Sequence, residues 1–284
     1  MGRTRTRTMI QTADGISISV ETCGSGRPIV LVHGWSQSAQ LFSSQIAALS
    51  DRFHVIAYDQ RGHGLSDKPN QGYRVHRLAH DLAELLAYLN LRDVTLLGHS
   101  MGCSVIWAYL DLFGTDRLHS LVLVDQSACL LRGRHWSEQQ ASDWGGLFSE
   151  SALFELVDQL RGPDGVDSTK AVLASMLTPG GATHLLDPLL EQNLLFPRIH
   201  AAQLLTNHGM TDWSDVIAQI RLPALVVGCG GSLISTSSMQ WIARQIPGSK
   251  YVEFSVQEGG SHFPFLENPD LFNQVLLTFL DGQA

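Results

Sequence analysis

Short apolar runs alternate with segments of helical periodicity along the first 124 residues of the chain. The helical segments span about residues 40–49 and 77–89, and the second has leucines at intervals of three to four residues. Apolar runs without polar alternation are typical of strands that are buried on both faces. The alternation therefore predicts a parallel sheet with helices on both faces. The predicted strands of this region are 16–20 in an opening hairpin, 28–32, 53–58, 94–97 and 118–124.

The pattern changes after about residue 130. Residues 130–213 are predicted as helices separated by proline breaks, and they contain no apolar run typical of a buried strand. The strand pattern resumes at 223–227 and 251–254, and a closing helix is predicted over 269–280. We therefore expect a helical lid inserted into the sheet domain, over the carboxyl ends of its strands. The predicted division is residues 1–129 and 214–284 for the core domain and 130–213 for the lid.

The pentapeptide Gly98-His99-Ser100-Met101-Gly102 lies between a predicted buried strand and a predicted helix. Its flanking glycines allow a sharp turn that would project the Ser100 hydroxyl above the end of the sheet. A G-x-S-x-G motif in this strand–turn–helix context is typical of a nucleophilic serine. The alternative is an ordinary turn whose serine caps the following helix.

A serine hydroxyl is a weak nucleophile and needs a general base, which in turn needs an acid to orient it. Among the 12 histidines, His262 follows the last predicted strand in a glycine-rich loop that can direct an imidazole toward Ser100. We predict His262 as the general base, and a structural loop histidine is the alternative. His99 lies inside the pentapeptide, and we expect it to form a local hydrogen bond.

Three motifs together resemble the α/β-hydrolase superfamily, and the resemblance extends over nearly the whole chain. They are the run that ends in His33-Gly34-Trp35, the glycine-rich segment 59–67 and the pentapeptide around Ser100. The similarity is to the esterase, non-haem haloperoxidase and lactonase branches. It implies a mostly parallel eight-stranded sheet flanked by helices, with an inserted helical lid. It also implies that the backbone N–H groups of Trp35 and Met101 form an oxyanion hole.

The position of the acid is unusual. Members of the superfamily usually carry an aspartate in the loop where Gly231 stands here, but no carboxylate lies between Gly228 and Arg244. Asp125 directly follows the sixth predicted strand, and we predict it as the acid that orients His262. The alternative is an aspartate that caps or orders a loop. Two branches with an acid after this strand are similar to the chain: fungal zearalenone lactonases, which have glutamate there, and cofactor-free dioxygenases of 3-hydroxy-4-quinolones.

The leading functional hypothesis is a serine hydrolase that cleaves a carboxylic ester or lactone through an acyl-enzyme, with no metal or organic cofactor. The first alternative is a cofactor-independent dioxygenase, in which His262 and Asp125 deprotonate a hydroxylated N-heteroaromatic ring that then reacts with oxygen. The second is a binding module without catalysis. The predicted substrate-binding residues are Gly34, Trp35, Trp136, Trp144, Phe196 and Phe263.

Composition restricts the expected partners and the expected location of the protein. The chain has 284 residues and a formal net charge of −8, which argues against a nucleic-acid partner. No apolar stretch approaches the about 20 residues needed to cross a bilayer. The four cysteines have no metal-ligand spacing, and no secretory signal is recognised, so we expect free thiols and a cytoplasmic protein. The expected partner is a small hydrophobic ester or lactone, bound by a monomer or homodimer.

Overall fold

The computed structural model describes residues 4–283 and contains an eight-stranded sheet. Its strands are β1 (Thr6–Gln11), β2 (Ser17–Gly24), β3 (Pro28–Val32), β4 (His54–Tyr58), β5 (Val94–His99), β6 (Leu118–Val124), β9 (Ala224–Cys229) and β10 (Lys250–Phe254). They are arranged in the order β1-β2-β4-β3-β5-β6-β9-β10. The pairings β1–β2 and β2–β4 are antiparallel, and all others are parallel. The predicted mostly parallel α/β sheet is therefore confirmed.

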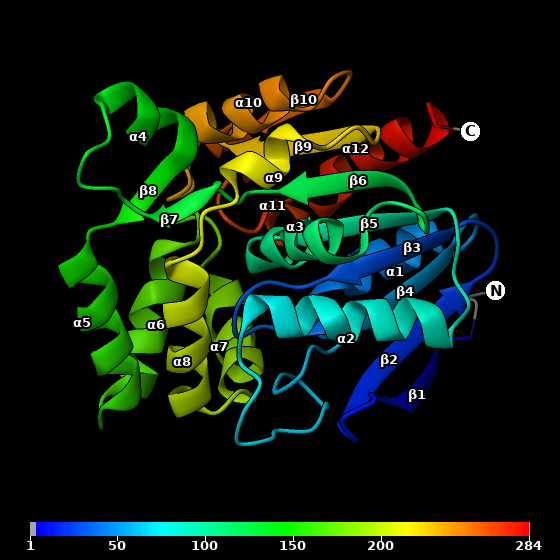
Figure 1. Ribbon diagram of the computed structural model, residues 1–284, viewed down its shortest axis with the longest axis horizontal. Helices are drawn as coiled ribbons and strands as arrows, with labels where there is room; N and C mark the ends of the chain where they lie inside the picture. The colour runs from blue at the N-terminus through cyan, green and yellow to red at the C-terminus, as the bar shows by residue number, and fades with distance from the viewer. Residues whose placement is uncertain (1–3, 284) are drawn as a thin grey trace.

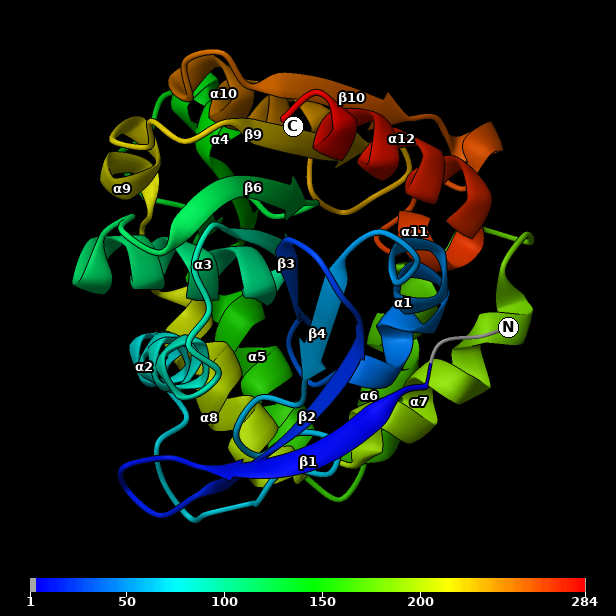
Figure 2. The ribbon, with the colours of Figure 1, turned by 90° about the vertical axis from the view of Figure 1, so that its right-hand side faces the viewer.

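Helices cover both faces of the sheet, as alternate side chains of one strand show. In β3, Ile29 and Leu31 belong to the apolar cluster on one face, whereas Val30 and Val32 belong to the cluster on the other. Because successive strand residues point to opposite faces, a strand buried on both must be apolar throughout. Figure 2 shows the helices of the two layers on either side of the central strands. They are α1 (Ser43–Leu49), α11 (Pro264–Glu267) and α12 (Pro269–Asp281) on one face, and α2 (Val75–Tyr88), α3 (Met101–Phe113), α9 (Ser214–Ala218) and α10 (Thr236–Gln245) on the other.

The inserted segment, residues 130–213, lies beyond the carboxyl end of β6, at the end toward which its arrowhead points in Figure 1. Its helices are α4 (Glu138–Trp144), α5 (Glu150–Arg161), α6 (Gly165–Ser175), α7 (Leu186–Leu194) and α8 (Arg198–Gly209). The boundaries predicted for a separate lid domain stay a prediction. Along residues 4–283, no helix combines the length and the apolar character needed to span a membrane.

The segment predicted as helices also contains strand structure that its sequence did not indicate. Two short strands, β7 (Cys129–Leu131) and β8 (Gly145–Phe148), pair in parallel, and the Arg132 N–H extends the pairing by donating to the Phe148 carbonyl oxygen at 2.8 Å. Strands of three and four residues are too short to show a hydrophobic period. Their pairing depends on contact between segments that are separated in sequence.

Candidate active site

Ser100 occupies a sharp turn between β5 and α3. Its backbone has φ 53° and ψ −128°, an uncommon conformation for a residue with a side chain. Both flanking positions require glycine because there is no room for a side chain. A Cβ at Gly98 would lie 2.7 Å from the Cys103 nitrogen, and one at Gly102 would overlap the carbonyl oxygen of Val32. The close packing of α3 against the sheet holds Ser100 in place, at the end of a central strand.

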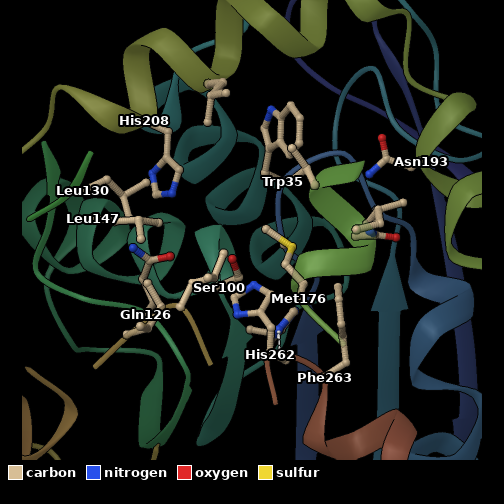
Figure 3. A pocket seen from close by; sticks show the side chains of 18 of the residues that line it. Trp35, Ser100, Gln126, Leu130, Leu147, Met176, Asn193, His208, His262 and Phe263 are labelled. Atoms are coloured by element: carbon tan, nitrogen blue, oxygen red, sulfur yellow. Dashed lines mark hydrogen bonds between the residues drawn. The ribbon is translucent and has the colours of Figure 1, made fainter. Parts of the chain in front are cut away.

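His262 and Asp125 form a buried hydrogen bond beside Ser100. The Nδ1 of His262 lies 2.7 Å from Oδ2 of Asp125, and both side chains are almost fully buried. A carboxylate can only accept, so Nδ1 carries the proton and Nε2 of the neutral ring keeps its lone pair. Figure 3 shows the His262 ring next to the Ser100 side chain. The structure therefore brings together the three residues predicted as nucleophile, base and acid.

Asp125 lies directly after β6 in the left-handed backbone region, with φ 52°. Its N–H donates to the Val227 carbonyl oxygen at 3.0 Å, which continues the pairing of β6 with β9. The pKa of Asp125 is raised above its ordinary value, because the effect of burial exceeds the opposing effect of the hydrogen bonds from His262 and Ser232. The Ser232 hydroxyl donates to the same Oδ2 as His262, and it comes from the loop after β9, in which no carboxylate is present.

His99 contacts His262 through a hydrogen bond and through its ring. Its Nε2 donates to the backbone carbonyl oxygen of His262 at 2.7 Å, and the two ring centroids are 4.7 Å apart. Burial holds the pKa of His99 well below its ordinary value, so the ring stays neutral. The hydrogen bond of His99 is therefore not the local one expected from the sequence, because its acceptor is 163 positions away in the chain, and it positions the loop that carries His262.

The two segments predicted to form an oxyanion hole meet at Ser100. A Cβ at Gly34 would lie 3.0 Å from the Ser100 Cβ, so the loop after β3, which continues with Trp35, passes directly beside the serine. Met101 is the first residue of α3, and an N–H at this position has no acceptor within its own helix. The Trp35 indole Nε1 donates to the Ala201 carbonyl oxygen at 2.8 Å and so ties this loop to α8.

A hydrogen-bond network that sequence reasoning missed holds the loop after β3. The Ser36 N–H donates to Nε2 of His63 at 3.1 Å, and the Ser36 hydroxyl donates to Oδ1 of Asn193 at 2.8 Å. The Arg198 guanidinium donates to the Ser36 hydroxyl at 2.7 Å and to Asn193 Oδ1 at the same distance. No carboxylate pairs with Arg198 in residues 4–283, and burial lowers its pKa to about 10. The network links α7 and α8 to the loop beside Ser100.

A cavity opens at Ser100 and His262, between the sheet and the inserted segment (Figure 3). Among the described residues that line it, none is Asp, Glu, Lys or Arg. A mostly apolar cavity with a few polar groups is typical of a site for a small organic ligand. Its apolar wall includes Leu130, Leu147, Phe148, Leu173, Met176 and Leu205.

Three of the six predicted substrate-binding residues line this cavity: Gly34, Trp35 and Phe263. The other three predicted residues are absent from its lining. Trp136 and Trp144 pack edge to face with each other, at 5.1 Å between centroids, and are absent from the lining. Phe196 is fully buried and packs on His63 at 4.0 Å between ring centroids. A bulky aromatic residue in a helical segment gives no sign of the side to which it points.

The polar lining residues Gln126, Asn193 and His208 were not predicted as binding residues. Asn193 and His208 lie in helices of the inserted segment, where no local motif distinguishes them from surface residues. Gln126 directly follows Asp125, and its place after the acid is the one signal that could have found it. Within the described chain, no group of three or more His, Cys, Asp or Glu side chains is arranged to hold a metal ion.

Comparisons with known proteins agree with this architecture. A sequence model of the alpha/beta hydrolase fold matches residues 27–269. A non-heme haloperoxidase of Rhodococcus erythropolis is 39% identical over 279 residues, which cover 96% of this chain and 99% of the relative. The bromoperoxidase from Bacillus anthracis superposes with a TM-score of 0.88 at 25% identity, covering 97% of this chain and all of that one. The esterase RhEst1 from Rhodococcus sp. ECU1013 superposes with a TM-score of 0.80 at 27% identity, covering 98% and 99%. The chain therefore belongs to the alpha/beta hydrolase family.

Proposed function

We propose that the protein is a serine hydrolase that cleaves a small hydrophobic carboxylic ester or lactone through an acyl-enzyme. The observation that carries the proposal is the hydrogen bond from His262 to Asp125 beside Ser100, which lines a mostly apolar cavity. This arrangement leaves Nε2 of His262 free to accept the Ser100 proton. The esterase among the similar structures supports the same reaction class.

The proposed reaction has two halves. The Ser100 oxygen attacks the carbonyl carbon and its proton passes to Nε2 of His262, while the N–H groups of Trp35 and Met101 stabilise the oxyanion. His262 then protonates the departing alkoxide, which leaves as an alcohol or, from a lactone, stays attached to the acyl group. Water attacks the acyl-enzyme, gives its proton to His262, and releases the carboxylic acid as Ser100 regains its proton.

A second candidate follows from the 39% identical relative, which is named a non-heme haloperoxidase. Hydrogen peroxide in place of water would attack the same acyl-enzyme. The proton of the peroxide would pass to His262 and the acyl group to the peroxide oxygen, so the product is a peroxy acid and Ser100 is restored. This reaction uses the same three residues and differs only in the nucleophile of the second half. Comparing turnover with and without hydrogen peroxide distinguishes the two candidates.

The test is reaction with a fluorophosphonate probe, followed by intact-mass measurement of the wild type and Ser100→Ala. We expect a single adduct on the wild type that is absent from the variant, and turnover in a screen of esters and lactones. A folded wild type that forms no adduct and cleaves no ester would overturn the proposal. Oxygen uptake with hydroxyquinolones in that case would instead support the dioxygenase alternative.

A further inference from the structure

His208 is a buried histidine on α8 that faces the cavity from the side opposite His262 (Figure 3). It is 3% exposed, and its Nδ1 is buried without a hydrogen-bond partner in the described part of the chain. Buried polar groups are nearly always paired, because an unpaired one costs about 1–3 kcal/mol. An imidazole kept in this position therefore points to a ligand group as its partner.

Its surroundings define what kind of group this is. Burial lowers the pKa of His208 to about 3, so the ring is neutral at physiological pH and can donate from one nitrogen and accept at the other. Among the described residues, no Asp, Glu, Lys or Arg side chain lines the cavity, so no residue of that kind would neutralise a charged group of a ligand. An uncharged group that donates and accepts, such as a hydroxyl, matches both nitrogens' capacities.

A second polar group lies at the same end of the cavity. Figure 3 shows Gln126 below His208, on the side away from Trp35. Its Nε2 donates to the Ser127 carbonyl oxygen at 3.0 Å, which fixes the amide and leaves Oε1 as an acceptor without a partner in the described chain. Asn193 Nδ2 and Gln37 Oε1 also lack a partner among the described residues, but Figure 3 shows Asn193 on the opposite side of the cavity from His208. His208 and Gln126 are therefore the two labelled polar side chains that share this end of the cavity.

We propose that His208 is a specificity-determining residue, which binds a hydroxyl group of the substrate at a distance from the reacting carbonyl. The preferred substrate is then an uncharged, largely apolar ester or lactone that carries such a hydroxyl, with Gln126 Oε1 as a second acceptor. The inference rests on the proposed function, since it takes the ligand to be an ester or lactone. Its test measures binding, so it does not depend on turnover.

The experiment uses the Ser100→Ala protein and matched probes: methyl 3-phenylpropanoate and its 2-, 3- and 4-hydroxyphenyl counterparts. Dissociation constants are measured by the fluorescence of Trp35 and the other tryptophans. We expect at least one hydroxyphenyl ester to bind roughly tenfold more tightly than the ester without a hydroxyl, as one buried hydrogen bond provides. Adding His208→Phe should bring this ratio close to one, and adding His208→Gln should retain part of it.

The matched control is His200→Phe, which changes another histidine of α8 whose ring stacks on Tyr73 at 4.5 Å and does not line the cavity. This control should keep the full preference, and thermal unfolding shows that each variant is folded. Equal binding of all four esters, or a preference unchanged by His208→Phe, would overturn the inference. Failure of the proposed function is seen separately, as the absence of fluorophosphonate labelling at Ser100 in the protein with an intact serine.

Discussion

His262 Nδ1 lies 2.7 Å from Asp125 Oδ2, although 137 residues separate the two in sequence. The contact arises because β9 pairs with β6 on one side and with β10 on the other, which places the ends of β6 and β10 at the same edge of the sheet. The loop after β9 contributes Ser232 to this contact in place of an acid. Asp125 reaches the imidazole from the neighbouring strand and performs the same orienting role in the proposed mechanism.

Asp125→Asn tests this role. The amide has nearly the same shape but can favour the wrong tautomer of His262, so we expect kcat on a cleaved ester to fall by about 10⁴-fold. The fold should remain intact, because the backbone N–H of residue 125 still donates to Val227. Steady-state kinetics and thermal unfolding check both parts. A variant with near-normal turnover would show that Asp125 only orders its loop.

Ser232→Ala removes one of the two hydrogen bonds at Oδ2 and leaves that of His262. We expect kcat to fall by roughly tenfold, which corresponds to the loss of one hydrogen bond to a buried acceptor. The same hydroxyl accepts from the N–H of Ile234, which lines the cavity, so KM should also rise. Kinetics of this variant beside Asp125→Asn give the comparison, and an effect as large as that of Asp125→Asn would contradict the expected ranking.

Gly102→Ala tests the steric origin of the serine turn. The added methyl group would overlap the Val32 carbonyl oxygen, a backbone atom that cannot rotate away. We expect a loss of about 2 kcal/mol or more in the free energy of unfolding, and a larger loss of labelling at Ser100 as α3 shifts from the sheet. The control is Gly181→Ala, where the nearest atom would lie 3.4 Å away. Equal unfolding midpoints for the two variants in urea would refute the steric explanation.

Arg198→Leu tests the link between the inserted segment and the loop beside Ser100. It removes the donors to the Ser36 hydroxyl and to Asn193 Oδ1, so both groups lose a buried partner. We expect kcat/KM to fall by about tenfold and stability to fall by roughly 1–3 kcal/mol. Arg221→Leu is the control, because the Arg221 side chain donates only to nearby carbonyl oxygens of its own segment. A drop in stability without any change in kcat/KM would show that the network does not position the loop.

His208 also predicts how stability depends on pH. Its folded-state pKa is about 3, whereas the unfolded chain has the ordinary value of about 6.5. Between these values the unfolded state binds a proton that the folded state does not, so stability falls as the pH decreases below about 6.5. Each such histidine contributes a slope of about 1.4 kcal/mol per pH unit. His208→Phe should flatten the pH dependence of urea unfolding between pH 6 and 4 by this amount, and an unchanged slope would show that His208 titrates normally in the folded protein.

Much of the fold was predictable because its signals are local. Strands such as β3 are apolar throughout, and α2 shows a regular leucine period. Short windows of sequence therefore indicate a parallel sheet and the succession of strands and helices along the chain. Ser100 and its two glycines form one contiguous motif, and His262 follows a strand in a glycine-rich loop. Strands β7 and β8 escaped prediction because their pairing depends on tertiary contact rather than on a local period.

The sequence alone therefore determined the sheet, the serine turn and the position of the histidine, since each depends on neighbours along the chain. Tertiary structure decided the rest. It brought Asp125 and Ser232 to one imidazole from two different strands, and it turned His208 toward the cavity while Phe196 packs elsewhere. The physical reason is packing between segments that are distant in sequence. Such packing decides to which side a side chain on an inserted helix points, and which two loops meet at the edge of the sheet.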